Sequence, residues 1–170
     1  MAKVKILRWA RALTGSFFQE CLRVLGELDD VDYFLDKAAS EGVRMYRQEF
    51  KLPPATRLFR DTTASAAYHA LILAPATSNT VAKCVVGISD TLVTNVFAQA
   101  GKCRLPAIVF ACDTAPELET DAPKGMVKVY PREIDLKNTE RLKSLESAVV
   151  VESLEDLRTA LGRRRHELHG

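Results

Sequence analysis

One short segment constrains the fold of this chain more than any other. Leu71–Ala74 is a run of apolar residues, which is typical of a strand buried on both faces of a parallel sheet. We expect the strand to stop at Pro75 and an apolar helical pattern to begin near Val81. Asn79 and Thr80 can cap that helix, whose first-turn N–H groups would face outward as donors. The segment is therefore either a ligand site or an ordinary strand-to-helix loop.

The rest of the chain alternates between strand and helix patterns. Strands are expected within 3–13 and at 31–35, 58–59, 69–74, 106–112, 127–130 and 148–151. Helices are expected at 17–28 and 38–47, after the segment above, after a Ser89 cap up to Gly101, and at 138–145 and 153–161. This order predicts an α/β fold with a doubly wound, Rossmann-like parallel sheet in three layers. Residues 1–162 would form a single domain, and the basic tail 163–170 a frayed end.

The third expected strand presents a problem of chain length. Nine residues separate Phe59 from His69, where the buried strand is expected to begin. A parallel crossover needs about a dozen residues or more. Either the third strand is absent or displaced, or its crossover is the abbreviated loop Asp61–Ala67.

Composition narrows the function classes. The net charge of +2 gives no global field that favours nucleic acid. No apolar run is long enough to span a bilayer and no signal peptide is evident, so a cytoplasmic protein is expected. The four cysteines form no C-x-x-C pair, which disfavours zinc and iron–sulfur sites and predicts reduced, mostly buried thiols. They are Cys21, Cys84, Cys103 and Cys112.

The sequence of the segment after Ala74 resembles that of a known family. The residues that carry the resemblance are Pro75-Ala-Thr-Ser-Asn-Thr80, Gly87-Ile-Ser-Asp90, Leu92 and Thr94-Asn95. They resemble the flavoprotein superfamily of homo-oligomeric flavin-containing cysteine decarboxylases, whose signature is Pro-Ala-Ser-Ala-Asn-Thr, a helix and Gly-Ile-Ala-Asp-Asn-Leu. The Thr-Ser version here, with Phe34–Glu41 and Glu133–Leu142, looks most like the archaeal-type flavoprotein and dihydromethanopterin reductase branch. The resemblance implies FMN as the cofactor.

Five residues after the first two strands are implied to hold the flavin phosphate. At Thr14, Gly15 and Ser16 a glycine permits close backbone approach and a helix begins, although the triplet alone is also a simple turn. Asp36 and Lys37 follow the second strand, where relatives usually carry Ser or Thr in place of the aspartate. A carboxylate repels a phosphate unless Lys37 compensates, so Asp36 is either a cofactor residue or a plain cap.

The resemblance assigns the flavin ring to the central segment. Thr77, Ser78 and Thr80 would line the ring or its ribityl chain. Asn79 is the central polar residue and the predicted catalytic one, because its amide both donates and accepts. In the decarboxylases that asparagine holds a substrate carboxylate, whereas in a reductase it would stabilise the reduced ring. Asp113 is either a contact to the flavin or pterin edge or a helix or turn cap.

The implied reaction is hydride transfer from reduced FMN to a dihydropterin, in the one-carbon metabolism that uses tetrahydromethanopterin. Because the chain has no ligands for a cluster module, we expect a separate electron donor, such as a ferredoxin, a flavin reductase or a nicotinamide enzyme. Relatives assemble from trimers, so a trimer-based homo-oligomer is expected. Val96 and Phe97 would serve that assembly or belong to the core.

Two alternatives remain. A decarboxylase or prenyltransferase on the same fold would need a histidine or cysteine, or an arginine cluster, at the flavin edge. His69 lies too close to Asn79 for that role and is expected to be a packed or surface histidine, while the strand ending Ala-Cys-Asp-Thr lacks the Pro-Ala-Met-Asn pattern of the decarboxylase flap. The other alternative is a protein whose flavin site has decayed, which Asp36 and the short crossover favour.

Overall fold

A computed structural model describes residues 6–9, 18–28, 31–34, 57–59, 68–122 and 125–169. Six parallel strands form the main sheet in the order β3-β2-β1-β4-β5-β8, and β6 and β7 form a separate antiparallel hairpin. The strands are β1 (Ile6–Trp9), β2 (Val31–Phe34), β3 (Arg57–Phe59), β4 (Ala70–Ala76), β5 (Ala107–Ala111), β6 (Leu118–Ala122), β7 (Gly125–Val129) and β8 (Ala148–Val151). The helices are α1 (Phe18–Gly26), α3 (Ser78–Val86), α4 (Leu92–Lys102), α5 (Glu133–Lys143) and α6 (Leu154–His169).

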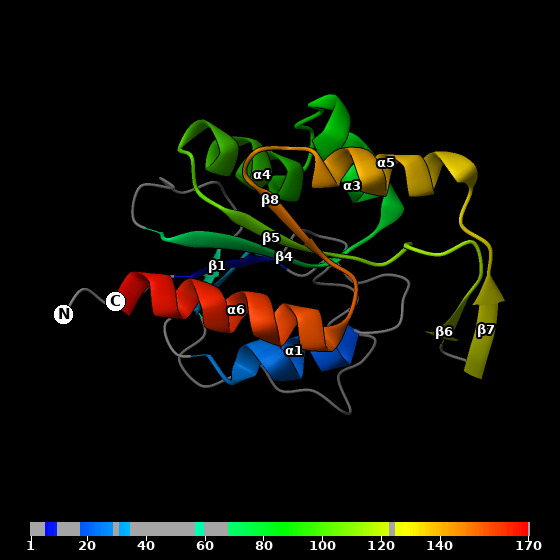
Figure 1. The fold of residues 1–170 in the computed structure, drawn as a ribbon, viewed down its shortest axis with the longest axis horizontal. Coiled ribbons are helices and arrows are strands. Elements are labelled where there is room, and N and C mark those ends of the chain that lie inside the picture. Colours follow the sequence, from blue (N-terminus) through cyan, green and yellow to red (C-terminus); the bar gives the residue numbers. More distant parts are fainter. Residues whose placement is uncertain are drawn as a thin grey trace.

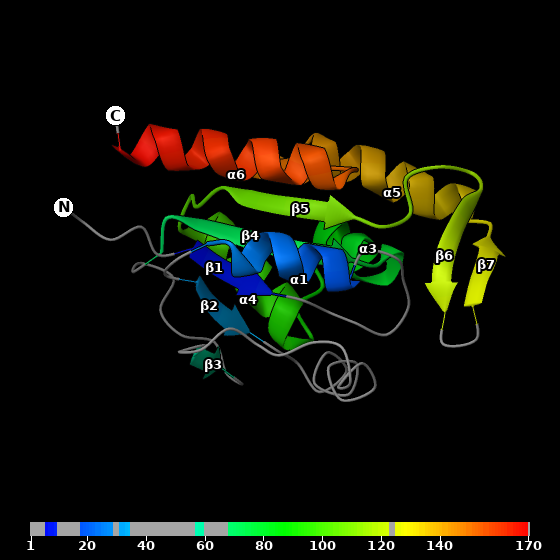
Figure 2. The ribbon, with the colours of Figure 1, turned by 90° about the horizontal axis from the view of Figure 1, so that it is seen from below.

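The sheet is the middle of three layers. Helices α1 and α6 cover one face, while α3, α4 and α5 cover the other (Figure 1). The β6–β7 hairpin lies beyond one end of the sheet, near the start of α5 (Figure 2). This is the doubly wound, Rossmann-like α/β architecture that the alternation of strands and helices predicts.

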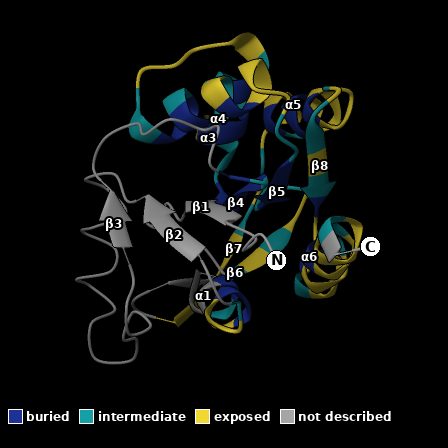
Figure 3. Cartoon of the chain, turned by 90° about the vertical axis from the view of Figure 1, so that its left-hand side faces the viewer, coloured by how far each residue is buried: buried dark blue, intermediate teal, exposed yellow. Residues whose placement is uncertain are grey.

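Strand β4 explains why both faces are covered. Successive side chains of a strand point to opposite faces, so an unbroken apolar run must bury both of them. Leu71 and Leu73 pack with α3 and α4, and Ile72 and Ala74 pack with α1 and α6. All seven residues of β4 are buried, and colouring by burial shows this apolar centre between the helical layers (Figure 3).

The third strand is present, which decides one open question. β3 pairs in parallel with β2 at the edge of the sheet. The short connection that follows it lies outside the described residues, as does the helix expected at 38–47. The apolar residues of α4 belong to the core, because Val96 is 3% exposed and Phe97 packs against the same core.

The C-terminal tail differs from the expectation. Residues 163–169, expected to be frayed, continue α6. The reason is a long-range contact, since Arg164 Nη2 donates to the carbonyl oxygen of His69 at 2.9 Å, just before β4. Within the described ranges, no helix is both long and apolar enough to cross a membrane.

Candidate functional site

The strand order places a switch point between β1 and β4. From β1 the chain proceeds outward to β2 and β3, and from β4 it proceeds in the other direction to β5 and β8. Connections that diverge in this way leave a crevice at the carboxyl ends of the two strands, where open α/β sheets bind ligands. β4 runs to Ala76, three residues beyond Leu73, which pairs with Trp9 at the end of β1. The segment after β4 therefore lies directly at this edge.

The segment after β4 begins its helix earlier than the sequence pattern indicated. β4 continues through Pro75, whose preceding peptide bond is cis, and ends at Ala76. Thr77 is the N-cap, with extended backbone angles of −70° and 157°, and its carbonyl accepts the Val81 N–H at 2.9 Å. The expected strand end at Pro75 and the expected helix start near Val81 were therefore wrong.

The predicted caps of this helix were also wrong, since Asn79 and Thr80 are inside its first turn. Thr80 is fully buried, and its hydroxyl oxygen lies 3.3 Å from that of Thr77. Its hydroxyl is therefore placed to support Thr77, and its predicted place at the flavin stays a prediction. Thr77 and Ser78 are half-buried, and Asn79 is exposed.

Asn79 is the polar group best placed to meet a ligand. Its side-chain amide makes no hydrogen bond within the part of the chain that the structure describes. An amide offers one acceptor and two donor hydrogens, and the pyrimidine edge of a flavin carries both donors and acceptors. An exposed amide beside half-buried hydroxyls at the switch point therefore fits a flavin ring.

Asp113 lies at the same edge, two residues after β5. Its Oδ2 accepts the backbone N–H of Ser78 at 3.2 Å, so its carboxylate caps the first residue of α3. The Thr139 hydroxyl in α5 donates to the carbonyl oxygen of Asp113 at 3.3 Å. The cap reading of Asp113 is confirmed, and this cap belongs to the helix at the site.

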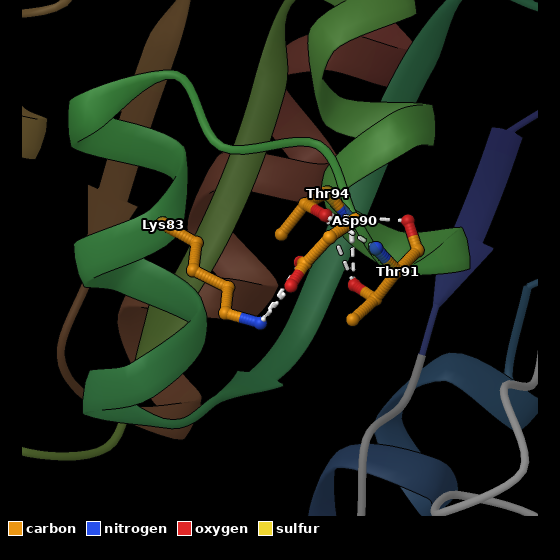
Figure 4. A network of polar contacts seen from close by, with 4 residues as sticks. All are labelled: Lys83, Asp90, Thr91 and Thr94. Carbon is orange, nitrogen blue, oxygen red and sulfur yellow. Dashed lines mark hydrogen bonds and ion pairs between the residues drawn. The ribbon is translucent and has the colours of Figure 1, made fainter.

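The far end of α3 is held by a second polar network. Lys83 Nζ donates to both carboxylate oxygens of Asp90 at 2.8 and 2.7 Å (Figure 4). The next helix, α4, has Thr91 as its N-cap, whose N–H and hydroxyl exchange hydrogen bonds with Thr94. The expected cap Ser89 was wrong, and α4 runs one residue past the expected stop at Gly101. This network positions α3 without contributing to the strand-end site.

The thiols near the site are unreactive by burial. Burial raises the pKa of Cys84 to about 12. The pKa of Cys112 is also raised, first by burial and then by the charges of Asp113 and Cys21. Among the described residues, no group of three His, Cys, Asp or Glu side chains is arranged to hold a metal.

Comparison with known proteins identifies the family. The Flavoprotein family matches residues 5–163. The chain belongs to this family. Among solved structures, DmrB of Burkholderia xenovorans in complex with FMN, described as a cubic protein cage for redox transfer, is 42% identical, covers 98% of each chain and has a TM-score of 0.83.

Two curated relatives come from methanogens. A Methanocaldococcus jannaschii protein of uncharacterized function is 30% identical over 89% of this chain and 91% of its own length. A dihydromethanopterin reductase (acceptor) of Methanosarcina mazei is 31% identical over 69% of this chain. The match covers 59% of the length of that reductase.

The predicted cofactor residues fall partly within the described ranges. Thr14, Gly15, Ser16, Asp36 and Lys37 lie outside the described residues. The described edge joins Thr77, Ser78, Asn79 and Asp113. Sequence reasoning missed Thr139, which braces Asp113, and its neighbour Asn138, which is 6% exposed. The available signal was a pair of adjacent polar residues inside a helix within a segment that resembles the family.

Proposed function

We propose that this chain is an FMN-dependent oxidoreductase that reduces a dihydropterin. One observation carries the proposal. An exposed Asn79 amide without a hydrogen bond stands at the switch point of a chain that is 42% identical to an FMN-bound protein across almost its full length. FMN, when bound, supplies the two-electron chemistry, and the protein supplies binding, orientation and electrostatics.

The residues at the strand ends divide these tasks. Asn79 offers hydrogen bonds to the polar edge of the flavin ring, and the half-buried hydroxyls of Thr77 and Ser78 lie beside the ring. Asp113 fixes the start of α3, so that Asn79 is presented in one orientation. The phosphate falls to the predicted set of Thr14, Gly15, Ser16, Asp36 and Lys37, and a proton for the substrate comes from water.

The substrate class follows from the name of the M. mazei relative, a dihydromethanopterin reductase. A dihydropterin carries an imine-like bond that accepts two electrons and two protons on reduction. The electrons come from a separate ferredoxin, flavin reductase or nicotinamide enzyme in the cytoplasm. Because the match covers 59% of that relative, the remainder of the relative has no counterpart in this alignment.

Decarboxylation is supported less well than reduction. His69 lies just before the amino end of β4, and Asn79 lies beyond its carboxyl end. A seven-residue strand spans about 20 Å, so the two residues are at opposite ends of β4. The expectation was a packed or surface histidine, and His69 is half-buried. The carboxylate of Asp113 also lies beside Ser78, and it would repel the carboxylate of a decarboxylase substrate bound next to Asn79.

Assembly into a trimer-based homo-oligomer completes the proposal. The FMN-bound relative is described as a cage. In this chain the β6–β7 hairpin and the start of α5 carry large apolar side chains with exposed fractions between 43% and 67%, which are Met126, Val127, Tyr130 and Ile134. Contiguous exposed apolar surface is typical of protein interfaces. We refer to these four residues as the apolar arm.

Saturation with FMN followed by gel filtration tests the proposal. Retained flavin absorption supports the site, and mixing the anaerobically reduced protein with 7,8-dihydropterin should then reoxidise the flavin. Asn79→Ala should weaken FMN retention or slow this reoxidation by about tenfold or more, the scale of one lost hydrogen bond to a charged group. The matched control is Gln99→Ala, which removes an exposed amide from α4 and should change neither. A protein that stays colourless after saturation contradicts the proposal and supports a decayed site.

A further inference from the structure

Asp113 is fixed at the start of α3 by three elements of the fold. It follows β5, its carboxylate accepts the Ser78 N–H of α3 at 3.2 Å, and its carbonyl accepts the Thr139 hydroxyl of α5 at 3.3 Å. The side chain is neither buried in the core nor free on the surface. A carboxylate held in this way acts as a fixed charge beside the segment 77–80.

The sign of the local charge follows from two magnitudes. The N-terminus of a helix carries about half a positive elementary charge, which by itself attracts anions. The carboxylate of Asp113 carries a full negative charge, so the sum at the start of α3 is about half a negative charge. Without Asp113 this edge would favour anions, and with it the edge disfavours them.

No described cation cancels this charge. Lys83, on the last turn of α3, is paired with Asp90 at 2.7 Å. Arg132, at the start of α5, is paired with Asp135 at 2.8 Å. Within the described ranges, neither a lysine nor an arginine forms an ion pair with Asp113.

We propose that Asp113 makes the FMN bound at this edge a stronger reductant by raising the energy of its reduced, anionic form. The inference rests on the proposed function, since it requires FMN at the strand ends. The oxidised ring is neutral, and uptake of two electrons and one proton leaves it with one negative charge. A fixed carboxylate repels that charge and leaves the neutral form unaffected, so it weakens binding of reduced FMN more than binding of oxidised FMN.

This electrostatic effect matches the need of the proposed reaction. An imine-like bond in a pterin is a weak electron acceptor, and a flavin with a lower potential transfers its electrons to it more completely. Asp113 would thus be a tuning residue that acts through its charge, in addition to its structural role as the cap of α3. The two roles are separable, because a neutral side chain with an oxygen atom preserves the cap and removes the charge.

The test is the midpoint potential of the FMN-loaded protein, measured by photoreduction against reference dyes. In Asp113→Asn the amide oxygen still accepts the Ser78 N–H, and the charge is removed. We expect reduced FMN to bind at least tenfold more tightly relative to oxidised FMN, which is a positive shift of about 30 mV for a two-electron couple. Should Asp113→Asn fail to fold, Asp113→Thr carries the same expectation, because its hydroxyl also accepts.

The matched control is Asp90→Asn, which removes the same charge from the other end of α3. A nine-residue helix is about 13 Å long, which exceeds the Debye length at physiological salt. The affinity of reduced FMN relative to oxidised FMN should therefore change less than twofold in Asp90→Asn. An unchanged potential in a folded Asp113→Asn protein, or equal shifts in both variants, overturns the inference and leaves Asp113 as a cap alone. Failure of the wild-type protein to bind FMN refutes the proposed function itself and is seen before any variant is made.

Discussion

Arg132 and Asp135 hold each other across the first turn of α5. The Arg132 side chain donates from Nε to Oδ2 at 2.9 Å and from Nη2 to Oδ1 at 2.8 Å, and its backbone N–H donates to Oδ2 at 3.0 Å. These hydrogen bonds from Arg132 hold the pKa of Asp135 below its usual value. Because α5 also carries Thr139, which braces Asp113, this pair anchors a helix that supports the site.

The pair predicts a pH dependence of stability. A carboxyl group whose pKa is lower in the folded state stabilises the fold above its unfolded pKa, about 4, and loses that contribution as the pH falls through its folded pKa. Asp135→Asn should cost at most about 1 kcal/mol near neutral pH, because the amide oxygen still accepts but the ion pair with the exposed Arg132 is lost. Below about pH 4 the difference from wild type should shrink.

Urea unfolding followed by circular dichroism from neutral to acidic pH measures this effect. Arg132→Ala removes the side chain that donates to Asp135 and keeps the carboxylate. Like Asp135→Asn, it should reduce the loss of stability that the protein shows as the pH falls. If Asp135→Asn and wild type lost stability in parallel as the pH falls, Asp135 would not be the responsible group.

Strand β8 offers two valines for a matched packing test. Val151 is 4% exposed and packs with α6, whereas Val149 is 45% exposed on the same strand. Val151→Ala should cost roughly 2 kcal/mol, the transfer of two methyl groups plus a residual cavity. Val149→Ala should cost less than half as much. Equal midpoint shifts in thermal or urea unfolding would show that Val151 does not pack as described.

The sequence predicted the centre of the fold well because its signals there are local. Strands β4 and β5 are continuous apolar runs, and each is buried along its whole length. The cap of α4 was misassigned although the information was present, since Thr91 and Thr94 have the spacing of a capping box and Ser89 does not fit it.

The remaining features depend on contacts between residues far apart in the chain. Asp113 and Ser78 are separated by 35 positions, and no local pattern pairs them. Arg164 and His69 are separated by 95 positions, and their contact extends a helix whose last residues look like a solvated tail. Helix α3 begins early because the Thr77 carbonyl accepts the Val81 N–H and Asp113 accepts the Ser78 N–H, which residue types alone do not specify.

The cysteines give a chemical test of burial. Thiolates, rather than thiols, react with alkylating agents. With its pKa raised to about 12 by burial, Cys84 is almost entirely protonated at pH 8, and burial raises the pKa of Cys112 as well. Cys103 is exposed, so iodoacetamide should label it first in the native protein. Peptide mass spectrometry reads the sites, and rapid labelling of Cys84 or Cys112 without denaturant would contradict the described packing.

The apolar arm gives a test of assembly. Met126 and Tyr130 are 62% and 67% exposed, and their hairpin lies beyond the sheet (Figure 2). If copies of the chain meet there, replacing both residues with serine removes much of the apolar area that the contact buries. Met126→Ser combined with Tyr130→Ser should therefore lower the molar mass measured by light scattering after gel filtration.

The matched control is Ile88→Ser, which removes an apolar side chain that is 48% exposed after α3. It should leave the molar mass unchanged, because Ile88 is not part of the apolar arm. Circular dichroism must show that all three proteins are folded. A wild-type monomer would contradict the proposed assembly. An assembly that survives the arm substitutions and is lost in Ile88→Ser would place the contact between copies elsewhere on the molecule.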